Sequence, residues 1–354
     1  MLTTDWNLES QHPIIQSFVS KLTRHPKRIV FSEGEDKRVI AVAAKLVELK
    51  IIAPILIGRR AVIEQMANEI GVSLKFVGIK DPETSAELEL FCEYYSKSER
   101  FRGMKVAGVE DTVKRPQNFA AIMTQYGFAD AMLGGNQAVP STVFRSASSM
   151  IKSIDQDFSP FGVTILANQK PGKEGEITVL SDMAIIPNPT VQELAFIAKQ
   201  TAIFTKHILG KKPVVAMVSH SSKGSNYNSD SHKVEAATEL IQQAIINNSL
   251  DFDVVGEIQV DAALSEDAYN MKVEGAPFKK ADALVFPDLD ASNTALHLLE
   301  AFSDAKSVGH FIKGYTRPVA QVSRSANEAS LLNTAIILGS EAIKYRLLYD
   351  ADSY

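Results

Sequence analysis

The chain has 354 residues and a formal net charge of −5 at pH 7, with 45% hydrophobic and 22% charged residues. This length exceeds one typical domain and predicts two, and the composition is ordinary for a globular protein with a large core. The negative net charge excludes a general attraction to nucleic acid or to an anionic membrane, so an anionic ligand needs a local cluster of arginines.

Cysteine content and hydropathy narrow the class further. Cys92 is the only cysteine, which excludes an internal disulfide and a cysteine-based zinc site. The first residues contain acidic side chains and no apolar core of a secretory signal. No apolar stretch approaches the ~20 residues of a membrane-spanning helix. We therefore expect a cytoplasmic enzyme or ligand-binding protein that does not enter a membrane.

Short apolar strands alternate with amphipathic helices along most of the chain. The predicted strands are residues 28–31, 53–57, 129–133, 214–218, 253–258 and 283–286, and the predicted helices are 37–49, 61–70, 233–247 and 294–302. The turn-rich segment 169–176 is predicted to be a hairpin loop. This alternation predicts an α/β protein with mostly parallel sheets covered by helices on both faces.

Polar residues follow several of these predicted strands. In open α/β sheets, ligands bind beyond the carboxyl ends of the strands. The segments to inspect are residues 32–36, 134–136, 219–225 and 287–290.

The segment 219–225 reads SHSSKGS and follows a buried strand. Hydroxyl groups, backbone N–H groups and a lysine in one loop favour an oxyanion ligand, most often phosphate. An ordinary polar turn is the alternative for this segment taken alone. It is not a nucleotide P-loop, because it lacks the first glycine of that motif.

Taken together, the segments resemble one known family. The matching stretches are RIVFSEGEDKRV (28–39), SDMAIIPNPTVQELAFIA (181–198), AMVSHSSKGS (216–225), KVEAATEL (233–240), EIQVDAAL (257–264), LVFPDLDASNT (284–294) and KGYTRPVAQVSR (313–324). Their order and spacing are similar to those of the phosphotransacetylases, the phosphate acetyl/butyryl transferase family, from about residue 28 to about residue 345.

The resemblance implies an activity and an architecture. Phosphotransacetylases transfer an acyl group between coenzyme A and inorganic phosphate, with CoA as a substrate and no metal or other cofactor. Their fold is two three-layer αβα domains with mostly parallel sheets, like isocitrate and isopropylmalate dehydrogenases, and the active site lies in the interdomain cleft. The expected domains are residues 1–155 plus 309–354 and residues 156–308, with a homodimer formed through the second.

The resemblance also implies the site residues, position by position. Ser323 and Arg324 match the catalytic serine–arginine pair of the family. Arg145 keeps the family spacing from Gly135, whereas Arg100 matches a further arginine only approximately. An arginine beside a developing oxyanion stabilises its charge through fork-shaped donors, which suits acyl transfer.

Further positions of the family correspond to substrate contacts. The loop residues Ser221, Ser222, Gly224 and Ser225 are expected to bind phosphate. Asn293 and Asp288 keep their family positions in the segment FPDLDASN, and Asn293 and Gly135 are also expected substrate contacts.

Several departures from the family pattern bear on activity. The family usually has an acidic residue, proposed as the base for the CoA thiol, where this chain has Ser330; Glu328 is the candidate substitute. An arginine that often follows the FPDL segment is replaced by Glu300-Ala301. The family's Ser-Thr of the glycine-rich segment falls on Val139-Pro140, so the expected contacts Ser141 and Thr142 are displaced by two residues. The loop 273–282 is shorter than usual.

These departures leave several functions open. The first expectation is a phosphate acetyltransferase, with a longer-chain phosphate butyryltransferase as a variant. The second is a weakly active or inactive phosphotransacetylase-like protein that senses acyl-CoA. The third, a nicotinamide-dependent decarboxylating dehydrogenase, shares the architecture but would need acidic metal ligands and a dinucleotide motif that the sequence lacks.

Overall fold

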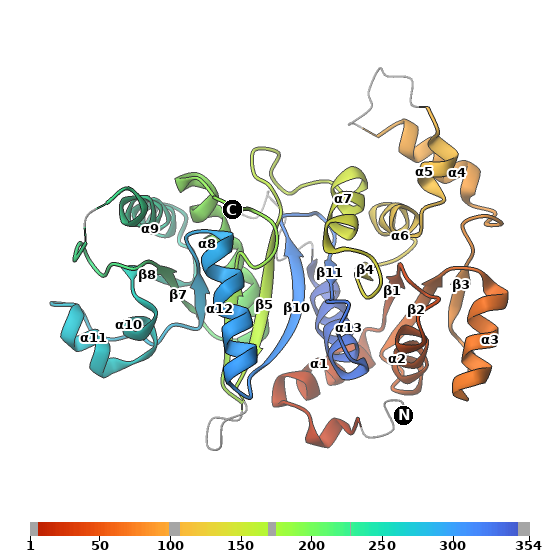
Figure 1. Ribbon diagram of the computed structural model, residues 1–354, viewed down its shortest axis with the longest axis horizontal. Helices are drawn as coiled ribbons and strands as arrows, with labels where there is room; N and C mark the ends of the chain where they lie inside the picture. The colour runs from red at the N-terminus through yellow and green to blue at the C-terminus, as the bar shows by residue number, and fades with distance from the viewer. Residues whose placement is uncertain (1–5, 99–106, 169–174, 227, 346–354) are drawn as a thin grey trace. The chain divides into compact units, whose positions relative to one another are not determined.

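The computed structural model describes residues 6–98, 107–168, 175–226 and 228–345, and the chain divides into two compact α/β units (Figure 1). Unit 1 takes in the chain up to Ile154 together with the residues from Tyr315 to the last described residue, and unit 2 extends from Asp155 to Gly314. The boundary expected at residue 308 falls inside a strand that pairs with unit 2.

Unit 1 contains a five-stranded parallel sheet. Its order is β3-β2-β1-β4-β11. The strands are β1 (Lys27–Phe31), β2 (Ile52–Ile57), β3 (Gly78–Lys80), β4 (Ala131–Gly134) and β11 (Val319–Gln321). Because all five run in parallel, their carboxyl ends lie along one edge, and β1, β4 and β11 are neighbours there.

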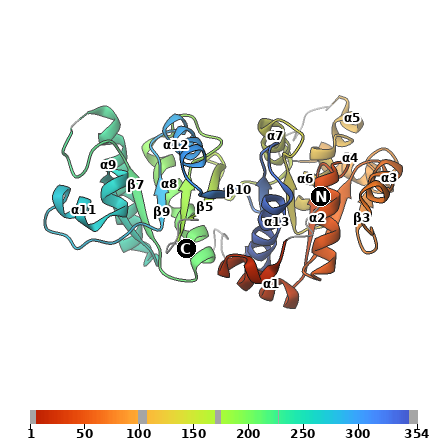
Figure 2. The same cartoon turned by 60° about the horizontal axis from the view of Figure 1, so that its bottom comes forward.

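Helices cover both faces of this sheet. One face packs against α2 and α13, with α1 lying along α13, and the other packs against α6 and α7 (Figure 2). The helices of unit 1 are the 3-10 turn η1 (Leu8–Ser10) and α1 (Pro13–Arg24), α2 (Lys37–Glu48), α3 (Arg60–Ile70), α4 (Leu88–Ser96), α5 (Val109–Val113), α6 (Pro116–Gln125), α7 (Pro140–Met150) and α13 (Glu328–Ile343).

Unit 2 contains a mixed sheet. Its order is β10-β5-β6-β9-β7-β8, and the last four strands are parallel, whereas β5 pairs in antiparallel fashion with both β10 and β6. The strands are β5 (Phe161–Ala167), β6 (Ile177–Ser181), β7 (Val214–Val218), β8 (Asp253–Ile258), β9 (Ala283–Val285) and β10 (Lys306–Lys313). The antiparallel pairing of Ala167 with Ile177 confirms the predicted hairpin; its tip, residues 169–174, lies outside the described residues.

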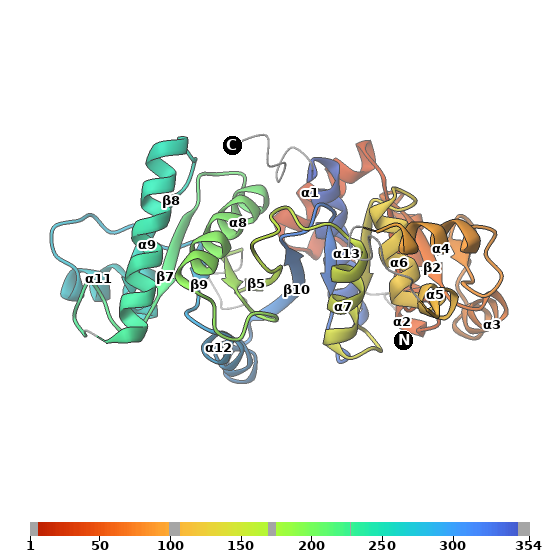
Figure 3. The same ribbon diagram turned by 90° about the horizontal axis from the view of Figure 1, so that it is seen from above.

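The helices of unit 2 also form two layers. They are α8 (Val191–Leu209), α9 (Ser229–Asn248), α10 (Val260–Leu264), α11 (Glu266–Lys272) and α12 (Leu289–Phe302). Helices α8 and α9 pack on one face of the strands and α12 lies on the other (Figure 3). Leu296 of α12 and Ala262 of α10 are buried against the sheet residues Leu284 and Val218. The predicted α/β class with mostly parallel sheets is confirmed.

The observed helices of unit 2 begin earlier than predicted. Helix α12 starts at Leu289 because the carboxylate of Asp288 accepts the Ala291 N–H at 2.8 Å and caps it. Helix α9 starts at Ser229 because the side chain of Asn228 accepts the N–H groups of Asp230 and Ser231. Both caps lie in polar segments, so the spacing of hydrophobic residues does not reveal where these helices begin. Within the described residues, no helix is both long and apolar enough to cross a membrane.

Asp182 is a buried carboxylate that holds the turn after β6. It accepts N–H groups from Gly162 at 2.7 Å, Ala184 at 2.9 Å, Ile185 at 3.3 Å and Ile186 at 2.6 Å. Burial raises the pKa of this carboxyl, and the backbone donors act in the opposite direction. The aspartate of the segment 181–198 therefore has a structural role.

Replacing Asp182 with alanine would leave these buried N–H groups without their acceptor. We expect Asp182→Ala to lower the free energy of unfolding by about 3 kcal/mol or more, because each buried unsatisfied group costs about 1–3 kcal/mol. The control Asp288→Ala removes one capping bond and should cost only about 1 kcal/mol. Urea unfolding followed by circular dichroism measures both, and equal losses would contradict the structural role of Asp182.

Candidate functional site

Three strand ends of unit 1 meet at one edge of its sheet. The N–H of Ser32, after β1, donates to the carbonyl of Leu133 at 3.0 Å, and the N–H of Val322, after β11, donates to the carbonyl of Gly134 at 2.9 Å. The loops 32–36, 134–138 and 322–327 therefore lie side by side. Two of them, 32–36 and 134–138, include strand ends that the sequence analysis singled out.

The carboxylate of Glu33 fixes the glycine-rich loop after β4. One of its oxygens accepts the N–H groups of Gly135 at 3.0 Å and Gln137 at 3.1 Å. The other accepts from Ala138 N–H at 2.8 Å and from the Gln117 amide at 3.3 Å. Glu33 is buried. Glu33 follows a predicted strand, but the sequence does not predict its role. That role depends on contacts with residues about 100 positions away.

Gly135 allows this loop to approach the loop after β11. Its φ is +99°, and a Cβ at this position would lie 2.6 Å from the carbonyl oxygen of Val322. Both features exclude a larger side chain without a shift of the backbone. The expected role of Gly135 as a substrate contact stays a prediction, whereas its packing against the segment before Ser323 is direct.

Ser323 and Arg324 form an exposed turn between β11 and α13. The Ser323 hydroxyl lies 2.8 Å from the Ser325 hydroxyl, and the Ser323 carbonyl accepts the N–H of Ala326 at 3.0 Å. Among the residues that the structure describes, no partner contacts the guanidinium of Arg324. Its five N–H donors are therefore available for an anionic ligand.

Arg145 lies on α7 and is exposed. Its guanidinium donates to the Ser141 carbonyl at 3.2 Å and to the Ser141 hydroxyl at 2.9 Å, one helical turn earlier. Ser141 therefore orients Arg145. Thr142 lies beside Ser141 in the same first turn, and Val139 is the residue before the helix.

Glu328 and Ser330 occupy the first turn of α13. The side chain of Asn327 caps this helix by accepting the Ser330 N–H at 2.9 Å. Residues two apart on a helix do not face each other, so a carboxylate at Glu328 points away from the direction of residue 330. If Glu328 acts as a base, it does so from a different face of α13 than the face of residue 330.

In unit 2, the serine loop 219–226 surrounds the buried carboxylate of Glu257. One Glu257 oxygen accepts the Ser221 hydroxyl at 3.0 Å and the Gly224 N–H at 2.7 Å. The Ser225 hydroxyl accepts the N–H of Ser222 at 3.0 Å, and the Ser222 hydroxyl accepts the N–H of Gln259 at 3.0 Å. Two of the four residues expected to bind phosphate, Ser221 and Gly224, thus donate to an internal carboxylate.

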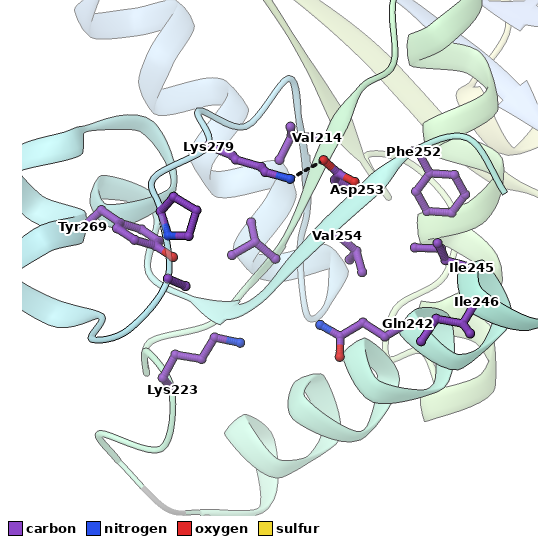
Figure 4. Close-up of a pocket in the computed structure, with 13 residues that line it drawn as sticks. Val214, Lys223, Gln242, Ile245, Ile246, Phe252, Asp253, Val254, Tyr269 and Lys279 are labelled. Atoms are coloured by element: carbon purple, nitrogen blue, oxygen red, sulfur yellow. Dashed lines mark hydrogen bonds and ion pairs between the residues drawn. The ribbon is translucent and has the colours of Figure 1, made fainter. Parts of the chain in front are cut away.

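The lysine of this loop points elsewhere. Lys223 has a φ of 49°, and its ammonium group donates to the carbonyl of Gly256. Its side chain lines a pocket of about 470 Å³ at the edge strand β8, where Lys279 is paired with Asp253 at 2.6 Å (Figure 4). Within this loop, the ammonium group of Lys223 is thus held by a backbone carbonyl, whereas Ser221 donates to Glu257.

A second, polar pocket of about 570 Å³ lies in unit 2 where β7 and β9 end. Its charged and polar lining includes His220, Asp230, Lys233, Asp288 and Asp290. Lys233 donates to the Asn188 side chain at 2.7 Å and to the Pro287 carbonyl at 3.0 Å. Lys233 belongs to the segment KVEAATEL (233–240), and the sequence pattern predicts no role for it. Asn293 lies further along α12 and is exposed.

Two further expectations concern Arg100 and the absence of a metal. Arg100 lies outside the described residues. Among the residues that are described, no three His, Cys, Asp or Glu side chains converge as potential metal ligands.

Comparisons with known proteins agree on one family. The model of the family described as phosphate acetyl/butaryl transferase matches residues 13–338. The chain is 30% identical to the phosphate acetyltransferase of Clostridium acetobutylicum over 327 residues, which cover 92% of this chain and 97% of that protein.

Solved structures give the same result. A phosphotransacetylase from Streptococcus pyogenes superimposes with a TM-score of 0.85 at 27% identity, covering 94% of this chain and 98% of that one. A protein from Salmonella typhimurium described as a putative 4-hydroxythreonine-4-phosphate dehydrogenase has a TM-score of 0.51 at 11% identity, with 92% and 99% covered, and shows the fold alone. The predicted dehydrogenase-like architecture is thereby confirmed.

The contact of Gly135 with the loop after β11 can be isolated with a matched glycine. Gly127 also has a positive φ, +81°, but a Cβ there would meet nothing within 4 Å. Gly127→Ala should cost about 1 kcal/mol of unfolding free energy from backbone strain alone. Gly135→Ala should cost a further ~1–3 kcal/mol, because its Cβ must displace the backbone at Val322. Parallel urea titrations test the difference, and its absence would show that the two loops do not pack closely.

Proposed function

Because the chain belongs to the phosphate acetyl/butaryl transferase family, we propose that it is a phosphate acetyltransferase. It interconverts acetyl-CoA plus phosphate with acetyl phosphate plus CoA. The observation that carries this proposal is the exposed Ser323-Arg324 turn, in which the arginine keeps all its donors for a ligand beside a serine hydroxyl. CoA is a substrate, and the reaction uses no metal or other cofactor.

The chemistry follows from the charge that develops during transfer. A phosphate oxygen attacks the thioester carbonyl, and the carbonyl oxygen becomes an oxyanion. The planar guanidinium of Arg324 stabilises that oxyanion through fork-shaped donors and stays charged at any physiological pH. The C–S bond then breaks, CoA leaves as a thiolate, and the thiolate takes up a proton. In the reverse direction the thiolate attacks acetyl phosphate and phosphate leaves.

We propose that further residues contact the substrates. Arg145, oriented by Ser141, and Arg100 supply further positive charge for the phosphate groups of the substrates. Gly135, Thr142, Asn293 and the serine loop (Ser221, Ser222, Gly224, Ser225) contact substrate. For the loop, the Glu257 carboxylate is a competing occupant, since an external phosphate on the same donors would be repelled by it.

Assembly and location belong to the same proposal. A homodimer through unit 2 is supported by exposed apolar side chains on α12, where Leu298 is 52% and Phe302 85% exposed. We further propose that the enzyme acts in the cytoplasm and needs no nucleic acid or membrane for its reaction.

One observation favours an alternative, an acyl-CoA sensor that turns over slowly or not at all. Ser330 stands where the family carries an acidic residue, and the geometry of α13 directs Glu328 to another side. A free thiol such as that of cysteine has a pKa near 8.5 and is only a few per cent ionised at pH 7, so a missing base slows the reaction of the CoA thiol without preventing it.

The primary test is CoA release from acetyl-CoA with phosphate, alongside butyryl-CoA to decide chain length. Wild type should turn over acetyl-CoA faster than butyryl-CoA. Because the Arg324 guanidinium is proposed to stabilise the oxyanion, Arg324→Ala should lower kcat by about 10² or more. The surface variant Arg60→Ala, which loses an exposed pair with Glu64, serves as the control and should keep full activity. An unchanged rate in folded Arg324→Ala would remove Arg324 from the mechanism.

The second test separates a displaced base from a missing one. If Glu328 takes the thiol proton, Glu328→Gln should nearly abolish CoA acetylation by acetyl phosphate. If no base is present, Glu328→Gln should be silent and Ser330→Asp should raise the rate by about 10², most visibly below the thiol pKa. Ser330→Asn, of similar shape and without charge, is the control for Ser330→Asp.

A sensor predicts a third outcome for these variants. Neither wild type nor Ser330→Asp would turn over, although acetyl-CoA would still raise the melting temperature by mass action. That result would contradict the proposed enzymatic function and support an acyl-CoA sensor.

A further inference from the structure

Arg38 uses all five N–H donors of its guanidinium. Nε and Nη2 bind the two carboxylate oxygens of Asp36 at 3.1 and 2.7 Å. Nη1 donates to the carbonyl oxygens of Arg324 at 2.9 Å and Ala326 at 2.7 Å. The second proton of Nη2 goes to the carbonyl oxygen of Asn136 at 2.8 Å. An arginine has no further donor to give.

These bonds connect three loops that lie far apart in the sequence. Asp36 belongs to the turn after β1, Asn136 to the glycine-rich loop after β4, and Arg324 and Ala326 to the turn that carries the serine–arginine pair. Asn136 also donates its side-chain amide to Asp36 at 3.0 Å, which closes the network. The side chain of Arg38 is about 30% exposed and that of Asp36 about 8%, so water screens the network only in part.

The position of Arg38 is unfavourable for the helix that carries it. It lies in the first turn of α2, where the helix dipole disfavours a cation. Asp36 offsets this effect as the helix cap and as the bidentate partner. Although burial acts the other way, hydrogen bonds from Arg38 and Asn136 hold the pKa of Asp36 below its usual value, so the pair stays charged.

We infer that Arg38 is a positioning residue for acyl transfer: by holding the backbone at Arg324 and Ala326, it fixes the Ser323-Arg324 turn against the glycine-rich loop. The inference rests on the proposed function, since it assigns Arg38 a role in the same reaction. Arg38 touches no reacting atom. It acts by keeping the donors of Arg324 where the oxyanion forms, and a displacement of about 1 Å there can cost about 10² in rate.

Arg38→Lys is the sharpest substitution, because lysine keeps the charge and cannot reproduce the planar fork. The matched control is Arg28→Lys at the other end of β1. Arg28 also binds one carboxylate through two nitrogens, Asp130 at 2.8 and 3.3 Å, and one carbonyl, Phe128 at 3.2 Å, and it touches no loop of the site. Arg38→Lys should lose more stability than Arg28→Lys, because Arg38 makes five side-chain hydrogen bonds and Arg28 makes three, so the comparison of the two variants is made on kcat and exchange.

The two variants should differ in kinetics. Arg38→Lys should lower kcat about tenfold or more while the KM values for acetyl-CoA and phosphate change little, whereas Arg28→Lys should keep wild-type kcat. Should Arg38→Lys fail to fold, Asp36→Asn is the substitute: asparagine is an equally good helix cap, and its NH2 group replaces the oxygen that accepts from Nη2 of Arg38 and from the Asn136 amide. It should lower kcat in the same direction.

A measurement without catalysis completes the test. Hydrogen–deuterium exchange of the peptide spanning residues 322–328 should become faster in Arg38→Lys, or in Asp36→Asn, and stay unchanged in Arg28→Lys. Unchanged exchange and unchanged kcat in folded Arg38 variants would overturn the inference. If wild type itself has no turnover, the proposed function fails, and the exchange result alone still decides whether Arg38 holds the turn.

Discussion

The arrangement of unit 1 depends on one guanidinium placed among three strand ends. Parallel strands bring their carboxyl ends to the same edge, but the backbone that leaves each strand is free to diverge. Arg38 prevents this because each of its donors has a fixed direction and each is used. The exposed Ser323-Arg324 turn thereby gains a defined backbone, while the side chains of Ser323 and Arg324 stay exposed. Glu33 acts in the complementary sense, as an anion that gathers the N–H groups of the neighbouring loop.

Unit 2 uses buried carboxylates in a similar way. Asp182 collects the N–H groups of the turn after β6, and Glu257 collects a hydroxyl and an N–H of the serine loop. A loop rich in donors is the signature of an anion site, and here the anion is part of the protein. The donor pattern of such a loop therefore does not tell a substrate from a carboxylate of the protein, and here Glu257, more than 30 residues away in the sequence, takes two of the donors.

The arginine side chains differ in how many of their N–H donors are bound within the protein. Arg38, Arg28 and Arg59 are each committed to a carboxylate of their own unit. Arg145 is held by a serine of its own helix, and Arg324 is bound only through its backbone. Among these, Arg324 has the most donors left for a substrate. This difference is why we propose Arg324 as the residue that stabilises the transition state and assign the other arginines to the structure around it.

The sequence by itself determined the α/β class, the family and the strand ends at which polar residues gather. Strand periodicity is a local property, and the predicted strands at 28–31, 214–218 and 253–258 coincide with β1, β7 and β8 to within one residue. Ser323 and Arg324 were identified because their motif is contiguous. The starts of α9 and α12 were placed too late, because a helix cap is set by side-chain geometry.

Only the tertiary structure decided which groups the loops bind. The roles of Arg38, Glu33 and Glu257 depend on partners distant in sequence, and a motif contains no information on which carbonyl or N–H group lies opposite. The partner of Lys223 is the carbonyl of Gly256, and the start of α13 beside Glu328 is set by the cap at Asn327. These are properties of chain packing, so they become visible only once the strand ends are placed beside one another.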